Sequence, residues 1–170
     1  MAETRYIRQY DSYSCGAIVI INALKFLCCR QATYKCLRPI QKLCGCQYPN
    51  GTERKGIENA LNKLGVKFER KTGPKLKEVD KHIDKGGAII INYALGYEGH
   101  YSLCIGKTKK DYTMVNDLDA DTVSLCDKSL FRCMCETRPF NREPCCWFIF
   151  PGKVDEEKIK KYCYADKKIA

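Results

Sequence analysis

Four residues of this sequence could together carry out acyl transfer at a thiol: Gln9, Cys15, His100 and Asp117. Cys15 follows a polar run over residues 11–14, which contains two serines, and comes immediately before a long apolar stretch. Serines at such a boundary are typical helix N-caps, because the hydroxyl can accept a hydrogen bond from an unpaired amide of the first turn. We therefore expect Cys15 at the N-terminus of a helix, where the helix dipole favours a thiolate over a thiol.

A cysteine nucleophile also needs an oxyanion donor and a base. Gln9, six residues before Cys15, has a side-chain amide that can donate a hydrogen bond to a developing oxyanion. The sequence contains two histidines. His82 lies in a run of alternating charges and is expected to be a partly exposed helix residue. His100 follows a loop and opens a predicted strand, where a rigid scaffold can aim it, so His100 is the expected general base.

The base in turn needs a partner that fixes its orientation and tautomer. Asp117 lies 17 residues after His100, at the end of the next predicted strand. The start of one strand of a hairpin lies beside the end of the other, so we expect the Asp117 carboxylate to reach the far ring nitrogen of His100. Asp119 is an alternative for the same role.

The elements that would hold these residues are helices in the first half of the chain and strands in the second. Residues 15–29 are apolar on nearly every face, which predicts a buried central helix. Further helices are predicted over about 54–64 and from Leu76 to the glycines at 86–87, and strands over 66–69, 88–93, 101–105, 112–115 and 147–150. Helices followed by antiparallel strands indicate an α+β fold, in which the helix carrying Cys15 packs on a C-terminal antiparallel sheet.

Length and composition indicate one globular domain over residues 1–152, followed by a charged, helical tail over 153–170. No apolar run approaches the roughly 20 residues of a membrane span, and residues 1–6 lack the apolar region of a signal peptide. We therefore expect a cytoplasmic protein, or a host-cytoplasmic or virion protein if the source is viral. The thirteen cysteines are an odd number, which argues against a secreted disulfide framework. Most are expected to be small buried hydrophobes.

The segment from Gln9 to Gly16 resembles the active-site segment of bacteriocin-processing peptidases, a papain-like family that cleaves double-glycine leader peptides. Members often carry the pattern Gln-x-Asp-x-x-x-Cys-Gly. The similarity continues through residues 57–65 and 87–93 and ends in His100-Tyr-Ser-Leu-Cys-Ile-Gly106 followed by residues 112–117. It covers about residues 5–120 and leaves the cysteine-rich segment 126–146 unexplained.

The resemblance implies a papain-like cysteine peptidase fold and the hydrolysis of a peptide or protein substrate. Cys15 would be the nucleophile, His100 the general base and acid, and Asp117 the orienting carboxylate. Gln9 and the Cys15 backbone amide would hold the oxyanion. No cofactor or metal ion is expected, and the oligomeric state is left open.

Three alternatives remain at this stage. Papain-like sites also carry out acyl or amide transfer, deamidation and thioester hydrolysis, because all of these reactions pass through an acyl-cysteine. A structural zinc site is a second alternative, with ligands drawn from Cys44, Cys46, Cys126, Cys133, Cys135, Cys145 and Cys146, although their spacings are not those of paired zinc knuckles. The net charge of +10 would also suit a nucleic-acid binder. Acidic residues interleave with the lysines, however, which favours an ordinary solvated surface.

Overall fold

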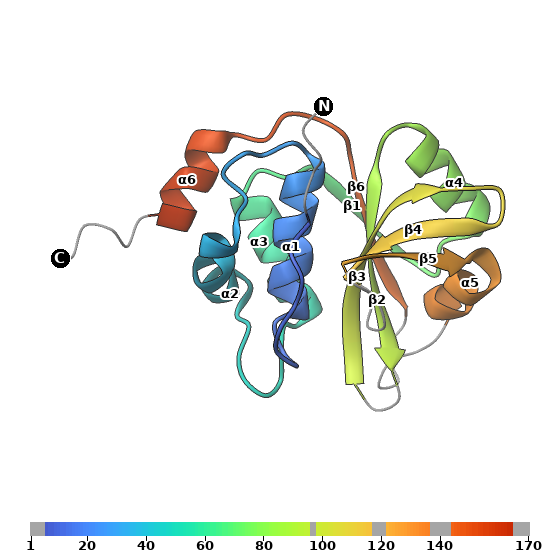
Figure 1. Ribbon diagram of the computed structural model, residues 1–170, viewed down its shortest axis with the longest axis horizontal. Helices are drawn as coiled ribbons and strands as arrows, with labels where there is room; N and C mark the ends of the chain where they lie inside the picture. Colours follow the sequence, from blue (N-terminus) through green and yellow to red (C-terminus); the bar gives the residue numbers. More distant parts are fainter. Residues whose placement is uncertain (1–5, 96–97, 117–121, 137–143, 165–170) are drawn as a thin grey trace. The chain divides into compact units, whose positions relative to one another are not determined.

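The computed structural model describes residues 6–95, 98–116, 122–136 and 144–164 (Figure 1). The chain divides into two compact units. A helical unit is formed by residues Met1–Lys67 together with Gly152–Ala170, and a sheet unit by Phe68–Pro151. The helical unit therefore combines two segments that are far apart in the sequence. In the described ranges, no helix is both long enough and apolar enough to cross a membrane.

The helical unit is built around α1 (Cys15–Phe26), which is buried from Cys15 to Leu24. Its neighbours α2 (Leu37–Cys44) and α3 (Arg54–Lys63) pack against it (Figure 1). The 3₁₀-helix η1 (Tyr34–Cys36) and α6 (Glu156–Tyr164) contact each other and α2. A helix that is apolar on nearly every face is stable only where other elements cover it. The predicted central helix is therefore present, and it ends three residues earlier than expected.

Residues 30–55 carry no clear periodic signal in the sequence, yet they contain α2. This helix has only eight residues, and Pro39 lies in its first turn. Proline is tolerated there, because the N–H that it lacks would have no partner within the helix. The helix ends at Gly45, whose φ of +63° is the left-handed conformation typical of a residue that follows a helix. The periodic signal of so short a helix is weak, which explains why it was missed.

The sheet unit contains a six-stranded antiparallel sheet with the order β1-β6-β2-β3-β4-β5. Its strands are β1 (Phe68–Thr72), β2 (Ala88–Leu95), β3 (Glu98–Lys107), β4 (Asp111–Val115), β5 (Val123–Asp127) and β6 (Cys145–Ile149). Two helices complete the unit, α4 (Leu76–Asp84) and α5 (Lys128–Glu136). The strands predicted from the sequence are present with small shifts of their ends, whereas β5 and α5 were not predicted.

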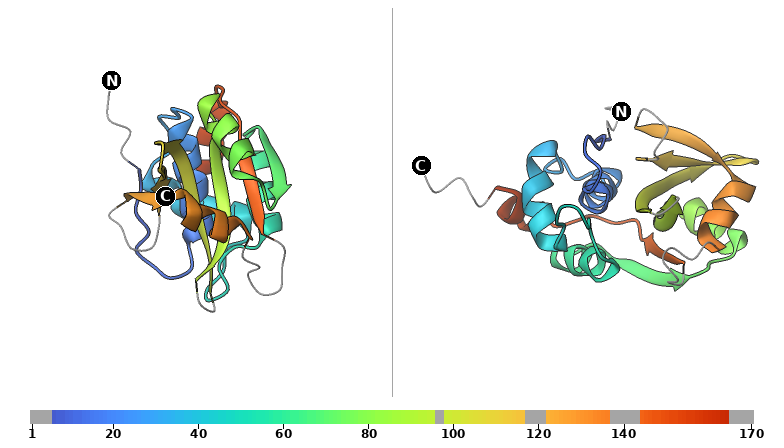
Figure 2. Two further views of the ribbon diagram at one scale, coloured as in Figure 1. Left: turned by 90° about the vertical axis from the view of Figure 1, so that its right-hand side faces the viewer. Right: turned by 90° about the horizontal axis from the view of Figure 1, so that it is seen from below.

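One face of the sheet carries the core of this unit. Val79 of α4 and Phe131 of α5 meet Ile89, Tyr112 and other buried side chains of the sheet. Both helices lie on this side of the strands, in front of them in the left view of Figure 2. Burial of these side chains is the main force that holds α4 and α5 to the sheet.

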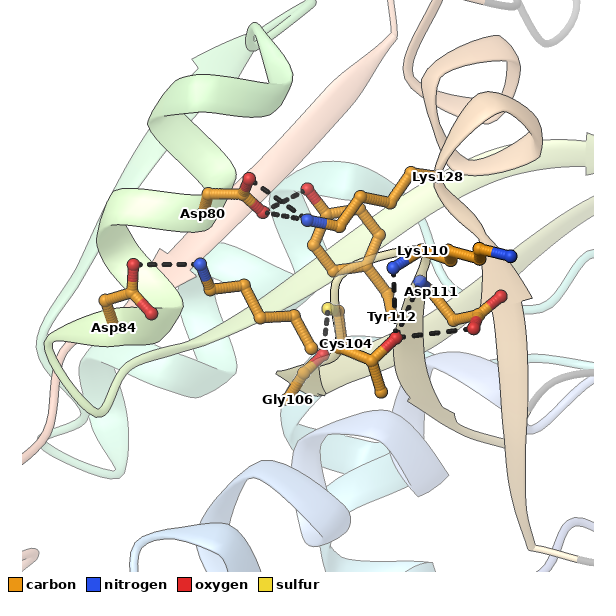
Figure 3. Close-up of polar contacts among 10 residues, drawn as sticks. Asp80, Asp84, Cys104, Gly106, Lys110, Asp111, Tyr112 and Lys128 are labelled. Atoms are coloured by element: carbon orange, nitrogen blue, oxygen red, sulfur yellow. Dashed lines mark hydrogen bonds and ion pairs between the residues drawn. The ribbon is translucent and has the colours of Figure 1, made fainter.

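A polar network adds a second attachment for α4 and α5. The Asp80 carboxylate on α4 accepts hydrogen bonds from the Tyr112 hydroxyl at 2.7 Å and from the Lys128 ammonium at 2.9 and 3.1 Å (Figure 3). Lys107 forms an ion pair with Asp84 at 2.9 Å. Burial, with the nearby Asp80 carboxylate, raises the pKa of Tyr112 far above its ordinary value, so the phenol stays protonated as a donor. One carboxylate thus ties α4 to β4 and to the first residue of α5.

Candidate active site

The turn before α1 is closed by Asp11. Its carboxylate Oδ1 accepts the backbone N–H groups of Tyr13 at 3.0 Å and Ser14 at 2.7 Å. The first helical hydrogen bond then runs from the Ile18 N–H to the Ser14 carbonyl at 2.9 Å. Ser14 is the N-cap residue, but its hydroxyl makes no capping bond and is buried without a partner in the described part of the chain. The expectation that a serine side chain caps α1 is therefore wrong, because Asp11 already satisfies the amides of the turn.

Cys15 occupies the first position of α1 and is buried. The N–H groups of a first helical turn have no partners within the helix, and together they make this end of the helix positive. Gly16 lets another segment approach this point closely. A Cβ atom on Gly16 would lie 2.5 Å from the Cβ of Thr52, closer than two carbon atoms can come. Cys15 therefore places a thiol at the helix N-terminus, and Gly16 leaves the space that the buried Thr52 side chain fills.

Gln9 is positioned by the buried Asn22 of α1. The Asn22 side chain accepts the N–H of Ile7 at 2.8 Å and donates to the Ile7 carbonyl at 3.0 Å. These two bonds hold Ile7, two residues before Gln9, against α1. The Gln9 amide donates to the Asp11 carbonyl at 2.5 Å. An amide NH₂ group carries two hydrogens, so a glutamine in this position can donate to its own turn and to a second acceptor together.

His100 lies on β3, opposite Tyr93 of β2, and is buried. Its Nε2 is 2.7 Å from the backbone carbonyl oxygen of Asn116. A carbonyl oxygen can only accept, so Nε2 must carry the hydrogen. The neutral ring then has its lone pair on Nδ1, which is the nitrogen able to take up a proton. The Tyr93 ring packs edge-on against the imidazole with 5.6 Å between ring centres, which also limits its rotation.

The acid expected beside His100 falls outside the described residues. Asp117 and Asp119 both belong to residues 117–121, so their assignment stays a prediction from the sequence. In the described part of the chain, the acceptor at Nε2 is the main-chain carbonyl of Asn116, the residue before Asp117. Sequence reasoning missed this contact because a backbone carbonyl leaves no side-chain signature.

His82 differs from its predicted state. It is buried, and its Nε2 lies 2.8 Å from the carbonyl oxygen of Ile149. Its ring also makes edge contacts with Phe148 and Phe150, and a Cβ atom on Gly87 would lie 2.2 Å from Nε2. The expectation of a partly exposed helix residue is wrong, because the His82 side chain contacts Phe148 and Ile149 of β6. A ring enclosed in this way is a structural histidine, which leaves His100 as the candidate base.

The remaining cysteines are mostly buried, and none of the thirteen is in a disulfide. Burial raises the pKa of Cys44 to about 11, which keeps it a thiol at neutral pH. Cys36 is the exception, because a hydrogen bond with Cys163 lowers its pKa to about 6 against the opposing effect of burial. Cys36 is therefore the thiol against which the reactivity of Cys15 must be controlled.

The zinc alternative finds no support in the described residues. No three His, Cys, Asp or Glu side chains in these ranges are arranged to hold a metal ion. Cys145 and Cys146 are neighbours on β6, and successive strand residues point to opposite faces of a sheet. These two thiols therefore cannot converge on one ion.

Gln9 and Cys15 thus belong to the helical unit, and His100 and Asn116 to the sheet unit. Within the helical unit, the turn closed by Asp11 connects the Gln9 amide to the start of α1. Within the sheet unit, the Asn116 carbonyl sets the tautomer of His100. The first arrangement suits a nucleophile with an oxyanion donor, and the second suits a general base.

No family model and no curated protein matches the sequence, but solved structures share its fold. The peptidase domain of Streptococcus ComA, a bifunctional ABC transporter involved in quorum sensing, matches with a TM-score of 0.66 and 18% identity, over 87% of this chain and 100% of that one. A double-glycine-motif protease from an AMS/PCAT transporter, solved in complex with the leader peptide, matches with a TM-score of 0.63 and 16% identity. The match covers 87% of this chain and 91% of that one. A C39-like peptidase from Bacillus anthracis matches with a TM-score of 0.65 and 11% identity, over 90% of this chain and 98% of that one.

These likenesses establish the fold of the chain. Its N-terminal helix beginning at Cys15 and its antiparallel sheet match the architecture of C39, papain-like peptidase domains. The expected α+β, papain-like fold is confirmed.

Proposed function

We propose that this chain is a cysteine peptidase that cleaves peptide bonds through an acyl-cysteine intermediate. The observation that supports this most strongly is the place of Cys15, at the first position of a buried helix in a chain with the fold of C39 peptidase domains. A thiol there benefits from the helix dipole and from the backbone amides of the first turn. The enclosed setting of His82 leaves His100 as the base for this thiol.

In the proposed reaction, the Cys15 thiol gives its proton to Nδ1 of His100 and the thiolate attacks the scissile carbonyl carbon. The Gln9 amide and the Cys15 backbone N–H donate hydrogen bonds to the resulting oxyanion. The imidazolium then protonates the leaving amine, and the acyl group remains on sulfur. Water, deprotonated by the neutral ring, hydrolyses this thioester and regenerates the thiol. Asp117 is proposed as the carboxylate that orients His100 and stabilises its imidazolium form.

A polypeptide is the proposed substrate. One of the solved structures with this fold holds a leader peptide, and the chemistry of an acyl-cysteine site suits any peptide carbonyl that it can bind. The proposal covers the class of substrate and the bond cleaved, and it leaves the sequence around that bond to experiment.

The proposal is tested by incubating the protein with a diverse peptide library and identifying products by mass spectrometry. We expect cleavage at a restricted set of sequences, and its complete loss in Cys15→Ala, because no other group in the proposal can form the acyl-enzyme. Cys36→Ala is the matched control, since a hydrogen bond with Cys163 lowers the pKa of Cys36, and it should retain cleavage. Undiminished cleavage by Cys15→Ala would refute the proposal, as would products of amide transfer or deamidation in place of hydrolysis.

A further inference from the structure

Asn116 directly follows β4 and has a backbone conformation that few residues adopt. Its φ is +63°, in the left-handed region, which asparagine tolerates better than most residues other than glycine. Its backbone N–H donates to the Thr122 carbonyl at 3.0 Å, and its side-chain Nδ2 donates to the Tyr101 carbonyl at 3.4 Å. These bonds fix the residue on two sides, so the direction of its own carbonyl is set by the turn.

That carbonyl accepts hydrogen bonds from two side chains. His100 donates from Nε2 at 2.7 Å, and the Ser102 hydroxyl donates at 3.0 Å. Because the Ser102 hydrogen is used in this way, the Tyr93 hydroxyl, 3.1 Å from the Ser102 oxygen, must be the donor in that pair. All four residues are buried, with exposed fractions of 6% or less. Every hydrogen of this network therefore points toward the carbonyl, and little water can compete for it.

We propose that the main-chain carbonyl of Asn116 orients His100 and fixes its Nε2–H tautomer, with Asn116, Ser102 and Tyr93 as positioning residues. The left-handed turn at Asn116 aims the carbonyl, and the two hydroxyls hold it in place. The catalytic consequence rests on the proposed function, whereas the tautomer can be measured without any substrate.

The first test is the protonation of the ring nitrogens, measured by ¹⁵N NMR in the Cys15→Ala background well above the ordinary histidine pKa of about 6.5. The sequence has only two histidines, and His100→Gln identifies the signals of His100 by their loss. We expect His100 to be protonated on Nε2 and unprotonated on Nδ1. His82, held by a different carbonyl, is the internal reference. A mixture of tautomers, or protonation on Nδ1, would overturn the inference.

The second test uses two substitutions that separate the carbonyl of Asn116 from its side chain. Asn116→Gly removes the side chain and keeps the left-handed backbone, so the carbonyl keeps its direction. Asn116→Val also keeps a carbonyl, but the branched side chain disfavours the left-handed backbone and so redirects that carbonyl. We expect the glycine variant to keep the Nε2–H tautomer and kcat within severalfold. In the valine variant we expect a mixed tautomer and a kcat lower by about tenfold to a hundredfold, with KM changed less, since the bond lost is one to a charged group.

The alkaline limb of the pH–rate profile should also move to lower pH in Asn116→Val, because the imidazolium loses its acceptor. Equal damage by glycine and valine would show that the Asn116 side chain is the important group and would overturn the inference. If the valine variant does not fold, Ser102→Ala decides the question, because it removes one of the two bonds that hold the carbonyl. A wild-type tautomer and wild-type kcat in Ser102→Ala would count against the proposal.

These outcomes also separate the inference from the proposed function. A fixed Nε2–H tautomer in a protein that cleaves no peptide would refute the peptidase and leave the orienting role of Asn116 standing. Peptide cleavage that depends on Cys15, together with a mixture of His100 tautomers, would support the peptidase and refute the orienting role of Asn116.

Discussion

The sheet unit contains two hydrogen-bond networks that each begin at a tyrosine hydroxyl, and they are built for different purposes. The Asp80 carboxylate accepts hydrogen bonds from Tyr112 on β4 and from Lys128 on α5 (Figure 3). Tyr93 donates through Ser102 to a neutral carbonyl that holds one side of an imidazole. The first network pairs a charge and fastens helices to the sheet. The second places a ring whose other nitrogen can still change its protonation.

The difference shows how burial can serve either stability or chemistry. A partly buried carboxylate such as Asp80 is stabilised by the donors around it, which favour its charged form. A histidine held by a carbonyl keeps one nitrogen whose proton affinity can be used near neutral pH. Substitutions in the two networks should therefore separate loss of stability from loss of activity.

The largest effect is expected from His100→Gln. Loss of the general base should lower kcat/KM by about a thousandfold or more, while the melting temperature changes by only a few degrees. Peptide cleavage and thermal unfolding measured on the same preparation check this. Activity within tenfold of wild type would remove His100 from the proposed mechanism and end the functional contrast between the two networks.

The opposite pattern is expected from Asp80→Ala. This change leaves the buried Tyr112 hydroxyl and the Lys128 ammonium without their acceptor, and should lower the free energy of unfolding by about 1–3 kcal/mol. Denaturant unfolding measures the change, and kcat of the folded fraction should stay within twofold. A loss of kcat without a loss of stability would show that the Asp80 network acts on the site.

The same network should give a pH dependence of stability. Burial raises the pKa of Asp80, but hydrogen bonds from Tyr112 and Lys128 outweigh it, so the pKa lies below its ordinary value. A carboxyl group with a lowered pKa in the folded state contributes stability above its unfolded pKa of about 3.9, and this contribution is lost as pH falls through the folded value. Unfolding measured between about pH 6 and 3 should therefore show a smaller acid-induced loss in Asp80→Asn than in wild type. Identical acid profiles would contradict this assignment.

The smallest and most closely matched comparison is Tyr112→Phe against Tyr93→Phe. Each change removes one hydroxyl from a buried ring. Tyr112→Phe should cost about 1–2 kcal/mol of stability, because its partner is a carboxylate, and leave kcat unchanged. Tyr93→Phe should cost about 1 kcal/mol or less and lower kcat a few-fold by loosening the Ser102 contact. If both changes affect only stability, the second network has no role in positioning the base.

The order of the elements and the candidate nucleophile could be predicted from the sequence because both have strong local signals. The change from a polar run to an apolar one at Cys15 marks a helix start, and the β-branched run at 88–93 marks a strand. The sequence shows Gly16 only as part of a family pattern. The structure gives the physical reason for a glycine there, which is the close approach of Thr52.

The features that escaped prediction depend on contacts distant in sequence or on the backbone. Asp11, not a serine, satisfies the amides before α1, and several polar side chains in that run could have served. His82 is predicted to be partly exposed because its sequence neighbours are charged, although its own ring contacts Ile149 of β6. The Asn116 carbonyl could have been suspected only from the tendency of asparagine to adopt a left-handed backbone at a strand end.

In the proposed mechanism, Cys15 and His100 act as one thiol–imidazole pair. The pH dependence of iodoacetamide alkylation, read by mass spectrometry of the peptide containing Cys15, tests it most directly. We predict a rate that reaches a plateau well below the free-thiol pKa of about 8.5 in the wild-type protein, and a single titration near that value in His100→Gln. Identical profiles in the two proteins would contradict the account.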